Sequence, residues 1–165
     1  SRWQVSPQLS DEDFEFLVMN SPLAAVDICV SVKQTLLLGK RNREPLRGRW
    51  FTPGGCVRKG ERWQDTAVRV ALSELGLQIN PEELESMGSW DQFYDHSVYS
   101  EKVFTHYVSR SYALFLSDYP DIISDEQHSE FRWVTLQEIG NGTEFSVYLK
   151  QYVKWFENLK ASEGC

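Results

Sequence analysis

A pair of glycines followed by a helix-forming segment, residues 54–77, constrains the fold of this chain more than any other stretch. After the short polar loop that follows Gly55, apolar residues recur at the 3.6-residue spacing that is typical of an amphipathic helix. Gly76 comes directly after this repeat, where a glycine readily adopts the left-handed conformation that ends a helix. The sequence therefore predicts a glycine turn at 53–55, a loop, and one amphipathic helix over residues 61–75.

Shorter patterns predict strands on both sides of this helix. Segments rich in β-branched and aromatic residues are expected to be strands, at 23–32, 35–40, 50–52, 86–95, 103–117 and 131–134. Two further apolar stripes predict a short helix after Ser10 and a longer one near 146–160. Charged or polar segments are expected to be loops, at 41–50, 96–102 and 119–128. The sequence therefore predicts a layered α/β domain.

Length and composition limit the classes of protein to which the chain can belong. The 165 residues are expected to form a single domain over 1–165, in which residues 1–9 are irregular or a cloning remnant. The net charge of −7 argues against nucleic acid and anionic membranes as partners. Basic residues nonetheless gather between Lys40 and Arg69. This cluster suits a small polyanion such as a diphosphate, although a solvated surface explains most of these residues as well.

Cysteine usage and hydropathy predict a cytoplasmic protein. The cysteines, at 29, 56 and 165, are odd in number and have no repeated spacing, which argues against a disulfide framework and against a zinc site. No apolar run approaches the length of a transmembrane helix, and Asp27 interrupts the apolar stretch 22–32. No cleavable signal pattern precedes that stretch.

The glycine-and-helix segment resembles the signature of the Nudix hydrolases, in which G, five residues, E, seven residues and R-E-U-x-E-E-x-G-U follow one another, with U aliphatic. The matching residues are Gly55, Glu61, Arg69, Ala71, Glu74, Gly76 and Leu77. Val70 and Ser73 stand where that family usually has glutamates. Positions 70, 73 and 74 share one helix face, where carboxylates would hold a hard cation such as Mg²⁺. Glu74 alone keeps that chemistry, so the alternative is a segment that has become purely structural.

Stretches outside this segment resemble one atypical branch of the family, the GDP-mannose mannosyl hydrolases. They are Pro22-Leu23 with Asp27, Leu38–Arg41, Gly48–Gly55, Ser73–Leu77, Phe93–Asp95, Thr105–Val108, Asp125–His128 and Phe131–Trp133. That branch lacks the same two glutamates. The resemblance implies a Nudix-type α/β/α sandwich with a mixed β-sheet, and a homodimer. It also implies hydrolysis of GDP-mannose to GDP and mannose by C–O cleavage, with inversion at the anomeric carbon.

The resemblance also implies a set of site residues. Metal ligands would be Glu74, the side-chain carbonyl of Gln127 and the backbone carbonyl of Gly54, holding Mg²⁺, with Mn²⁺ as the alternative cation. Substrate phosphates and water would complete the coordination. Because a single carboxylate suffices when the substrate carries the remaining charge, the missing glutamates are consistent with a working metal site.

His128, in the expected loop 119–128, is the predicted general base. Its ordinary pKa of about 6.5 lets an imidazole accept a proton from water near neutrality. The alternative is a solvent-exposed loop histidine that has no catalytic role.

Charge and hydrogen bonding for the substrate are assigned to five further residues by the same resemblance. Arg41 and Arg69 would offset the charge of the leaving diphosphate, and Tyr107 would donate a hydrogen bond to it. Asp27 and Tyr94 would bind the rest of the substrate, with Asp27 holding sugar hydroxyls. The alternatives are a salt bridge for Arg69, a core aromatic for Tyr107, and pairing of Asp27 with an arginine.

Two positions depart from the pattern of the branch. Cys56 directly follows the double glycine, where the branch has an arginine, and Gln92 stands where a histidine is expected. Cys56 is interpreted as a small loop residue and not as a nucleophile. Two other functions therefore stay open beside C–O hydrolysis. One is a Nudix pyrophosphohydrolase that cuts the P–O bond of a nucleotide sugar, and the other is a nucleotide-binding module without turnover.

Overall fold

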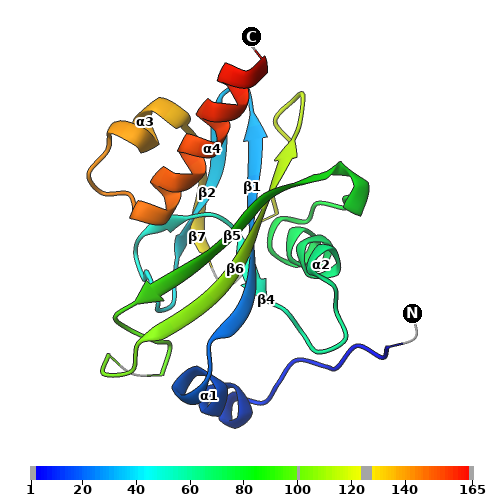
Figure 1. The fold of residues 1–165 in the computed structure, drawn as a ribbon, viewed down its shortest axis with the longest axis vertical. Coiled ribbons are helices and arrows are strands. Elements are labelled where there is room, and N and C mark those ends of the chain that lie inside the picture. Colours follow the sequence, from blue (N-terminus) through cyan, green and yellow to red (C-terminus); the bar gives the residue numbers. More distant parts are fainter. Residues whose placement is uncertain (1–2, 100, 124–127, 164–165) are drawn as a thin grey trace.

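The computed structural model describes residues 3–99, 101–123 and 128–163. A mixed sheet lies between helices, with α2 on one face and α3 and α4 on the other (Figure 1). The elements in chain order are α1 (Asp11–Asn20), β1 (Leu23–Val32), β2 (Thr35–Arg41), β3 (Trp50–Phe51), β4 (Gly54–Cys56), α2 (Trp63–Leu75), a 3₁₀ turn (Pro81–Glu83), β5 (Leu84–Tyr94), β6 (Thr105–Phe115), β7 (His128–Thr135), α3 (Leu136–Asn141) and α4 (Val147–Glu163). The predicted α/β/α sandwich with a mixed sheet is confirmed.

Strand β1 is the centre of the sheet, whose main path runs β3-β2-β1-β6-β5. β1 runs parallel to β6, from Leu23 opposite Tyr107 to Ser31 opposite Phe115. Its antiparallel pairing with β2 is confined to the hairpin, where Val32 lies opposite Thr35. β1 and β2 therefore stop pairing with each other within two residues of their turn.

The segment 50–56 bridges the gap that this divergence opens. β3 pairs with β2, Phe51 lying opposite Gly39, and three residues later β4 pairs with β1, Gly54 lying opposite Asp27. The predicted glycine turn at 53–55 was wrong in this respect, because Gly54 and Gly55 are strand residues. Pairing with β1 outweighs the weak strand propensity of two adjacent glycines.

Side-chain alternation along β1 divides the core into two layers. Val26, Ile28 and Val30 pack with the buried face of α2, whereas Cys29 packs with α3 and α4. Because successive strand residues point to opposite faces, Asp27 belongs to the α4 side of the sheet with Cys29. Functional side chains on β1 and its partners can therefore be assigned to a face by their position in the sequence.

Helix α2 begins at Trp63, two residues later than predicted, and ends as expected. The Asp65 carboxylate accepts a hydrogen bond of 2.9 Å from the backbone N–H of Arg62, which caps the first turn. Gly76 has φ 68°, the left-handed conformation, and its N–H bonds to the last turn.

Two further differences concern the C-terminal third. β7 begins at His128 and pairs with β2 along most of its length, so the predicted strand 131–134 was too short and His128 is not a loop residue. Helix α3 was not predicted; its N-terminus is capped by the Thr135 side chain, which accepts from the N–H of Glu138 at 3.0 Å. Within the part of the chain that the structure describes, no helix has the length and apolar character needed to cross a membrane.

Candidate active site

The free edge of β4 is the centre of the candidate site. Pro53 and Val57 bond to β1, through Ile28 N–H to Pro53 C=O and Val57 N–H to Ala24 C=O, both 2.9 Å. The backbone groups of the intervening residue Gly54 therefore point the other way, because alternate residues of an edge strand face opposite sides. Its N–H donates to Oε2 of Glu74 at 3.2 Å. The carbonyl of Gly54 lies on the same edge as the Glu74 carboxylate.

Gly54 also has no room for a side chain. A Cβ atom there would lie 2.6 Å from Oδ1 of Asp27 and 2.6 Å from the carbonyl oxygen of Val26. Gly54 and Asp27 are opposite each other in the β1–β4 ladder, so the carboxylate occupies the space of the missing side chain. The glycine therefore allows a carboxylate to lie directly against the β4 backbone.

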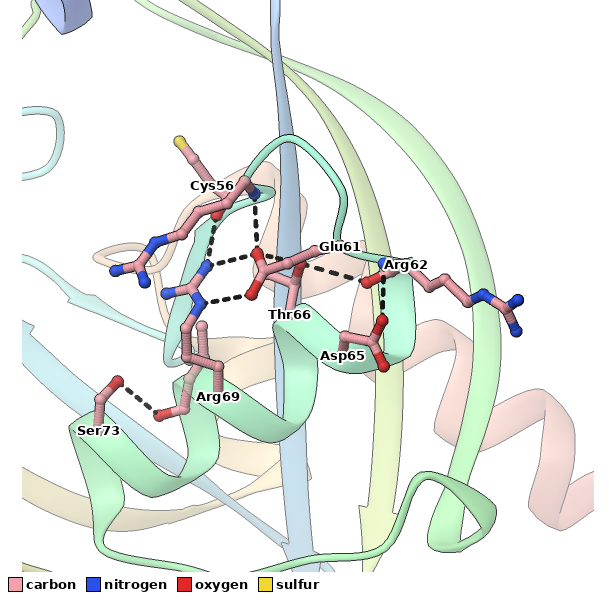
Figure 2. A network of polar contacts seen from close by, with 9 residues as sticks. Cys56, Glu61, Arg62, Asp65, Thr66, Arg69 and Ser73 are labelled. Atoms are coloured by element: carbon pink, nitrogen blue, oxygen red, sulfur yellow. Dashed lines mark hydrogen bonds and ion pairs between the residues drawn. The ribbon is translucent and has the colours of Figure 1, made fainter. Parts of the chain in front are cut away.

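Arg69 joins the β4 edge to the loop before α2 (Figure 2). Its guanidinium donates to both oxygens of Glu61, at 2.8 and 3.0 Å, and to the carbonyl oxygen of Cys56 at 2.8 Å. Glu61 also accepts from the N–H of Arg58 at 2.8 Å and from the Thr66 hydroxyl at 3.0 Å. Arg69 therefore holds β4 and the loop together, and it brings a cation to the site through the same contacts.

The two positions of α2 that lack glutamates have different surroundings. Val70 is buried, and its Cγ2 lies 2.9 Å from the position that a Cβ on Gly55 would take. Ser73 is exposed and bonds to the carbonyl of Val70. Glu74 is therefore the acidic side chain that α2 directs to the β4 edge.

Oxygen donors at this edge fit a hard divalent cation. The Glu74 carboxylate and the Gly54 carbonyl are both oxygen ligands of the kind that Mg²⁺ takes, with water and substrate phosphates in the remaining positions. Across residues 3–99, 101–123 and 128–163, no group of three His, Cys, Asp or Glu side chains forms a metal cluster. Gln127, the third predicted ligand, lies outside the described residues.

His128 is buried and lies on the α2 side of the sheet, with 2% of its surface exposed. Its ring packs over Gly39, because a Cβ on that glycine would be 2.5 Å from the His128 Cδ2 atom. Gly39 is on the same face of β2 as Leu37, which packs with the α2 layer. Arg41 lies opposite His128 in the β2–β7 ladder. The alternative of an exposed loop histidine is therefore wrong.

Arg41, opposite His128 in the β2–β7 ladder, also exerts its charge on residues of the other face of the sheet. Its Nε donates to the carbonyl of Pro45 at 2.7 Å, which anchors the loop 42–49. Its positive charge lowers the pKa values of Asp27 and Tyr107, in each case against a larger increase caused by burial. The charge of Arg41 therefore acts on two of the predicted substrate-binding residues, Asp27 and Tyr107.

A hydrogen-bonded network surrounds Asp27 on the α4 side. Oδ2 of Asp27 accepts from the Tyr152 hydroxyl at 2.5 Å and from Nε2 of Gln92 at 3.0 Å. The Tyr94 hydroxyl donates to Oε1 of Gln92 at 2.8 Å, and its ring lies 6.0 Å from that of Tyr107, centroid to centroid. Burial raises the pKa of Asp27, and the bonds from Tyr152 and Gln92 oppose this increase. The hydrogen bonds that hold Asp27 thus come from neutral groups, and the charge of Arg41, the arginine of the alternative, makes a smaller contribution to its pKa.

Cys56 shares the face of Asp27 and Tyr107. Burial raises the pKa of its thiol to about 11, although the charges of Arg69 and Arg41 act in the opposite direction. A thiol that stays protonated near neutrality is a poor nucleophile, which agrees with the interpretation that Cys56 is not a nucleophile. The expectation of a loop residue was wrong, because Cys56 is the last residue of β4.

Sequence reasoning missed two residues that shape this site. Tyr152 lies within the helix expected near 146–160, and nothing in its spacing indicates that its hydroxyl reaches β1. Gly39 lies in the matching stretch Leu38–Arg41, to which the resemblance assigns no role at this position, yet its missing side chain makes room for His128. A glycine inside an otherwise apolar strand was the available signal, because it often marks a close approach of another group.

Known proteins resemble this chain in sequence and in fold. A family model described as the NUDIX domain matches residues 21–156. The low-salt glycan biosynthesis protein Agl8 of Haloferax volcanii is 36% identical over 125 residues, which cover 76% of this chain and 78% of that protein. The m7GpppN-mRNA hydrolase NUDT17 of Danio rerio is 33% identical over 95 residues, covering 52% of this chain and 32% of that protein.

Solved structures share the fold at lower identity. A MutT/nudix family protein from Enterococcus faecalis superposes with a TM-score of 0.68 and 20% identity, covering 93% of this chain and 71% of that one. A MutT protein from Methanosarcina mazei Go1 gives a TM-score of 0.67 and 18% identity, covering 86% and 97%. These similarities concern the arrangement of the sheet and its flanking helices.

Proposed function

Because this chain belongs to the Nudix hydrolase family, we propose that it hydrolyses a nucleoside-diphosphate sugar, with GDP-mannose as the first candidate. Water would cleave the C–O bond at the anomeric carbon with inversion, giving a nucleoside diphosphate and the free sugar. The name of the Haloferax relative places that protein in glycan biosynthesis, a process that consumes nucleotide-activated sugars. By this likeness, a nucleotide-activated sugar is proposed as the substrate of this chain.

The observation that carries the proposal is the reduced set of carboxylates on α2. Glu74 lies against the β4 edge, whereas Val70 is packed under Gly55 and Ser73 is exposed. A site with one α2 carboxylate suits a single cation whose other ligands come from the substrate diphosphate. The base must then come from elsewhere, and His128 lies on the same face of the sheet as α2.

A divalent cation would be held by Glu74 and the Gly54 carbonyl, with Gln127 as the third protein ligand. Nudix hydrolases generally use such cations, and Mg²⁺ is proposed here with Mn²⁺ as the alternative. When bound, the cation neutralises charge on the diphosphate. Glu74 accepts from Gly54 N–H, which orients its carboxylate toward the edge where that carbonyl lies.

His128 would act as the general base. Its ring takes a proton from water while the water oxygen bonds to the anomeric carbon and the C–O bond to the diphosphate breaks. The diphosphate leaves with the bonding electron pair, and the proton on His128 is later lost to solvent. Packing against Gly39 fixes the position of the ring, as a base must be within hydrogen-bond reach of its proton.

Arg41 and Arg69 would stabilise the charge that develops on the leaving diphosphate, and Tyr107 would donate a hydrogen bond to it. Arg69 is already bonded to Glu61 and the Cys56 carbonyl, so its guanidinium is fixed before the substrate arrives. Burial raises the pKa of Tyr107, which keeps its hydroxyl protonated and able to donate. Fixed donors of this kind cost no reorganisation during the reaction.

A panel of nucleoside-diphosphate sugars, incubated with Mg²⁺ in ¹⁸O-labelled water, tests the proposal. C–O cleavage of GDP-mannose should give GDP and mannose, with the label in the sugar, and His128→Ala should abolish turnover. Label in a phosphate, together with GMP and mannose 1-phosphate, would contradict it. That result would identify the second candidate, a pyrophosphohydrolase, which the neutral Cys56 in place of an arginine favours. Equal, negligible turnover by the wild type and His128→Ala would indicate a binding module.

A further inference from the structure

The Asp27 carboxylate is held by a helix on the face of the sheet opposite α2. We propose that Tyr152 of α4 is a positioning residue: with Gln92 it fixes Asp27 so that Oδ1 faces the substrate beside Gly54. In this arrangement Oδ1 selects for a sugar hydroxyl. The inference rests on the proposed function, because it names the group that recognises the sugar of the nucleotide sugar.

The directions of the hydrogen bonds support this assignment. Nε2 of Gln92 donates to both Asp27 Oδ2 and the Tyr152 hydroxyl, the latter at 2.8 Å, while Oε1 accepts from Tyr94. The Ser111 hydroxyl donates to Tyr152 at 2.8 Å, which leaves the Tyr152 proton for Oδ2 of Asp27. Every hydroxyl and amide hydrogen of this network is therefore used when Oδ2 of Asp27 acts as an acceptor. A substrate group meets the other oxygen, Oδ1.

The position of Oδ1 places it next to the proposed diphosphate site. Oδ1 occupies the space where Gly54 would carry a Cβ, and Gly54 provides the proposed carbonyl ligand on its other side. A sugar hydroxyl that reaches Oδ1 is thus separated from the diphosphate by a single backbone residue. Any rotation of the Asp27 side chain would change the position in which the sugar is held relative to the diphosphate.

Helix α4 is itself held firmly against the sheet at this point. The Tyr152 ring packs edge-on against Trp90, with centroids 5.2 Å apart, and is fully buried. One turn earlier, the Tyr148 hydroxyl accepts from the N–H of Phe93 at 2.7 Å. Packing therefore fixes the Tyr152 ring independently of its hydroxyl, and removal of the hydroxyl alone leaves that packing in place.

Tyr152→Phe tests the role of the hydroxyl. We expect KM for GDP-mannose to rise roughly tenfold, the range of one hydrogen bond to a charged group, with kcat little changed. The inhibition constant of GDP, which has no sugar, should stay the same. Ser109→Ala is the matched control, since it removes a buried hydroxyl on the same strand as Ser111 that bonds to neither Tyr152 nor Asp27, and KM should change by less than about twofold. Equal weakening of GDP and GDP-mannose would overturn the inference.

A double-mutant cycle distinguishes positioning through Asp27 from a general structural effect. In an Asp27→Asn background, Tyr152→Phe should have little further effect on KM for GDP-mannose; an undiminished effect would contradict the inference. Gln92→Met removes the other donor to Oδ2 and should reproduce the change, which keeps the test open if Tyr152→Phe does not fold.

Calorimetry separates this inference from the proposed function. If the wild type hydrolyses no nucleoside-diphosphate sugar, the proposed function fails, and calorimetry decides the inference. Tighter binding of GDP-mannose than of GDP, abolished by Tyr152→Phe, would support it. No such difference in the wild type would overturn it.

Discussion

At the scale of single residues, missing side chains matter as much as present ones. Gly39 and Gly54 are each opposed by a side chain of the proposed site that fills the space of a Cβ, His128 in one case and Asp27 in the other. Sequence reasoning identified both partners from their resemblance to a family. It did not identify the contact with Gly39, because a glycine carries no chemistry that would draw attention to it.

Gly39→Ala should displace the proposed base. The new methyl group would lie 2.5 Å from Cδ2 of His128 and 2.9 Å from Cε1 of Phe131, so the histidine ring must move. Because small misplacements of a catalytic group are costly, we expect kcat for GDP-mannose to fall on the order of 10²-fold, with GDP affinity unchanged. Gly140→Ala is the control, since its methyl group would be at an ordinary 3.8 Å from Val153. Unchanged kcat in Gly39→Ala would argue against His128 as the base.

Cys56→Arg should accelerate hydrolysis. The thiol is neutral near pH 7, with its pKa at about 11, and lies within the influence of Arg41 and Arg69. Since a fixed cation at a developing negative charge is worth about 10²–10³ in rate, a further arginine should raise kcat for GDP-mannose by at least tenfold. Cys56→Ser serves as the control and should leave kcat nearly unchanged. Good binding with no gain in rate would show that existing cations already suffice.

At the scale of elements, predictions succeeded where local pattern and tertiary packing agree. The helix 61–75 could be predicted because apolar residues that repeat at helical spacing also form the surface that packs under the sheet. The strand character of β4 and the early start of β7 were missed. Both segments are strands because of partners far away in the chain, β1 and β2 respectively, and local propensity carries no information about such pairing.

Glu61 stabilises the loop before α2 through its hydrogen bonds, and a substitution there measures that contribution. Burial raises its pKa, but hydrogen bonds from Arg69 and from the Arg58 backbone outweigh this and lower it. A lowered pKa means that the stabilisation is present above the ordinary pKa and is lost as pH falls through the folded-state value. We therefore expect Glu61→Gln to lower the free energy of unfolding by about 1–3 kcal/mol at neutral pH.

Urea unfolding at neutral and acidic pH measures this effect. The difference between wild type and Glu61→Gln should shrink on acidification, because the protonated glutamate resembles the amide. Glu82→Gln, at an exposed position, should unfold like the wild type at both pH values. A difference that stays constant with pH would mean that the charge of Glu61 contributes nothing to the stability of its contacts with Arg69 and with the Arg58 backbone.

At the scale of the whole molecule, the fold class followed from the sequence, whereas the division of the site between two faces did not. Asp27, Tyr107 and Cys56 belong to the α4 side, and Glu74 and His128 to the α2 side, with β4 between them. Side chains alternate along a strand, but this assigns each of them to a face of the sheet only when the register of the strand is known. Register depends on pairing partners, which a single sequence does not reveal.

A homodimer is the whole-molecule prediction. It derives from resemblance alone, and light scattering after size-exclusion chromatography should give a mass of about twice the 19.2 kDa of one chain. A mass of one chain at all accessible concentrations would be the contrary result.

The divergence of β1 and β2 has an evolutionary consequence. Because β4 fills the gap between them, Asp27, the proposed sugar contact, is anchored in the layer under α4, whereas Glu74 and His128, the proposed metal ligand and base, are anchored in the layer beside α2. Substitutions under α4 can then change which sugar is accepted while the groups beside α2 are inherited intact, and the reverse also holds. A descendant of this chain would acquire a new substrate by drift in one layer at a time, without passing through a form that has lost both properties.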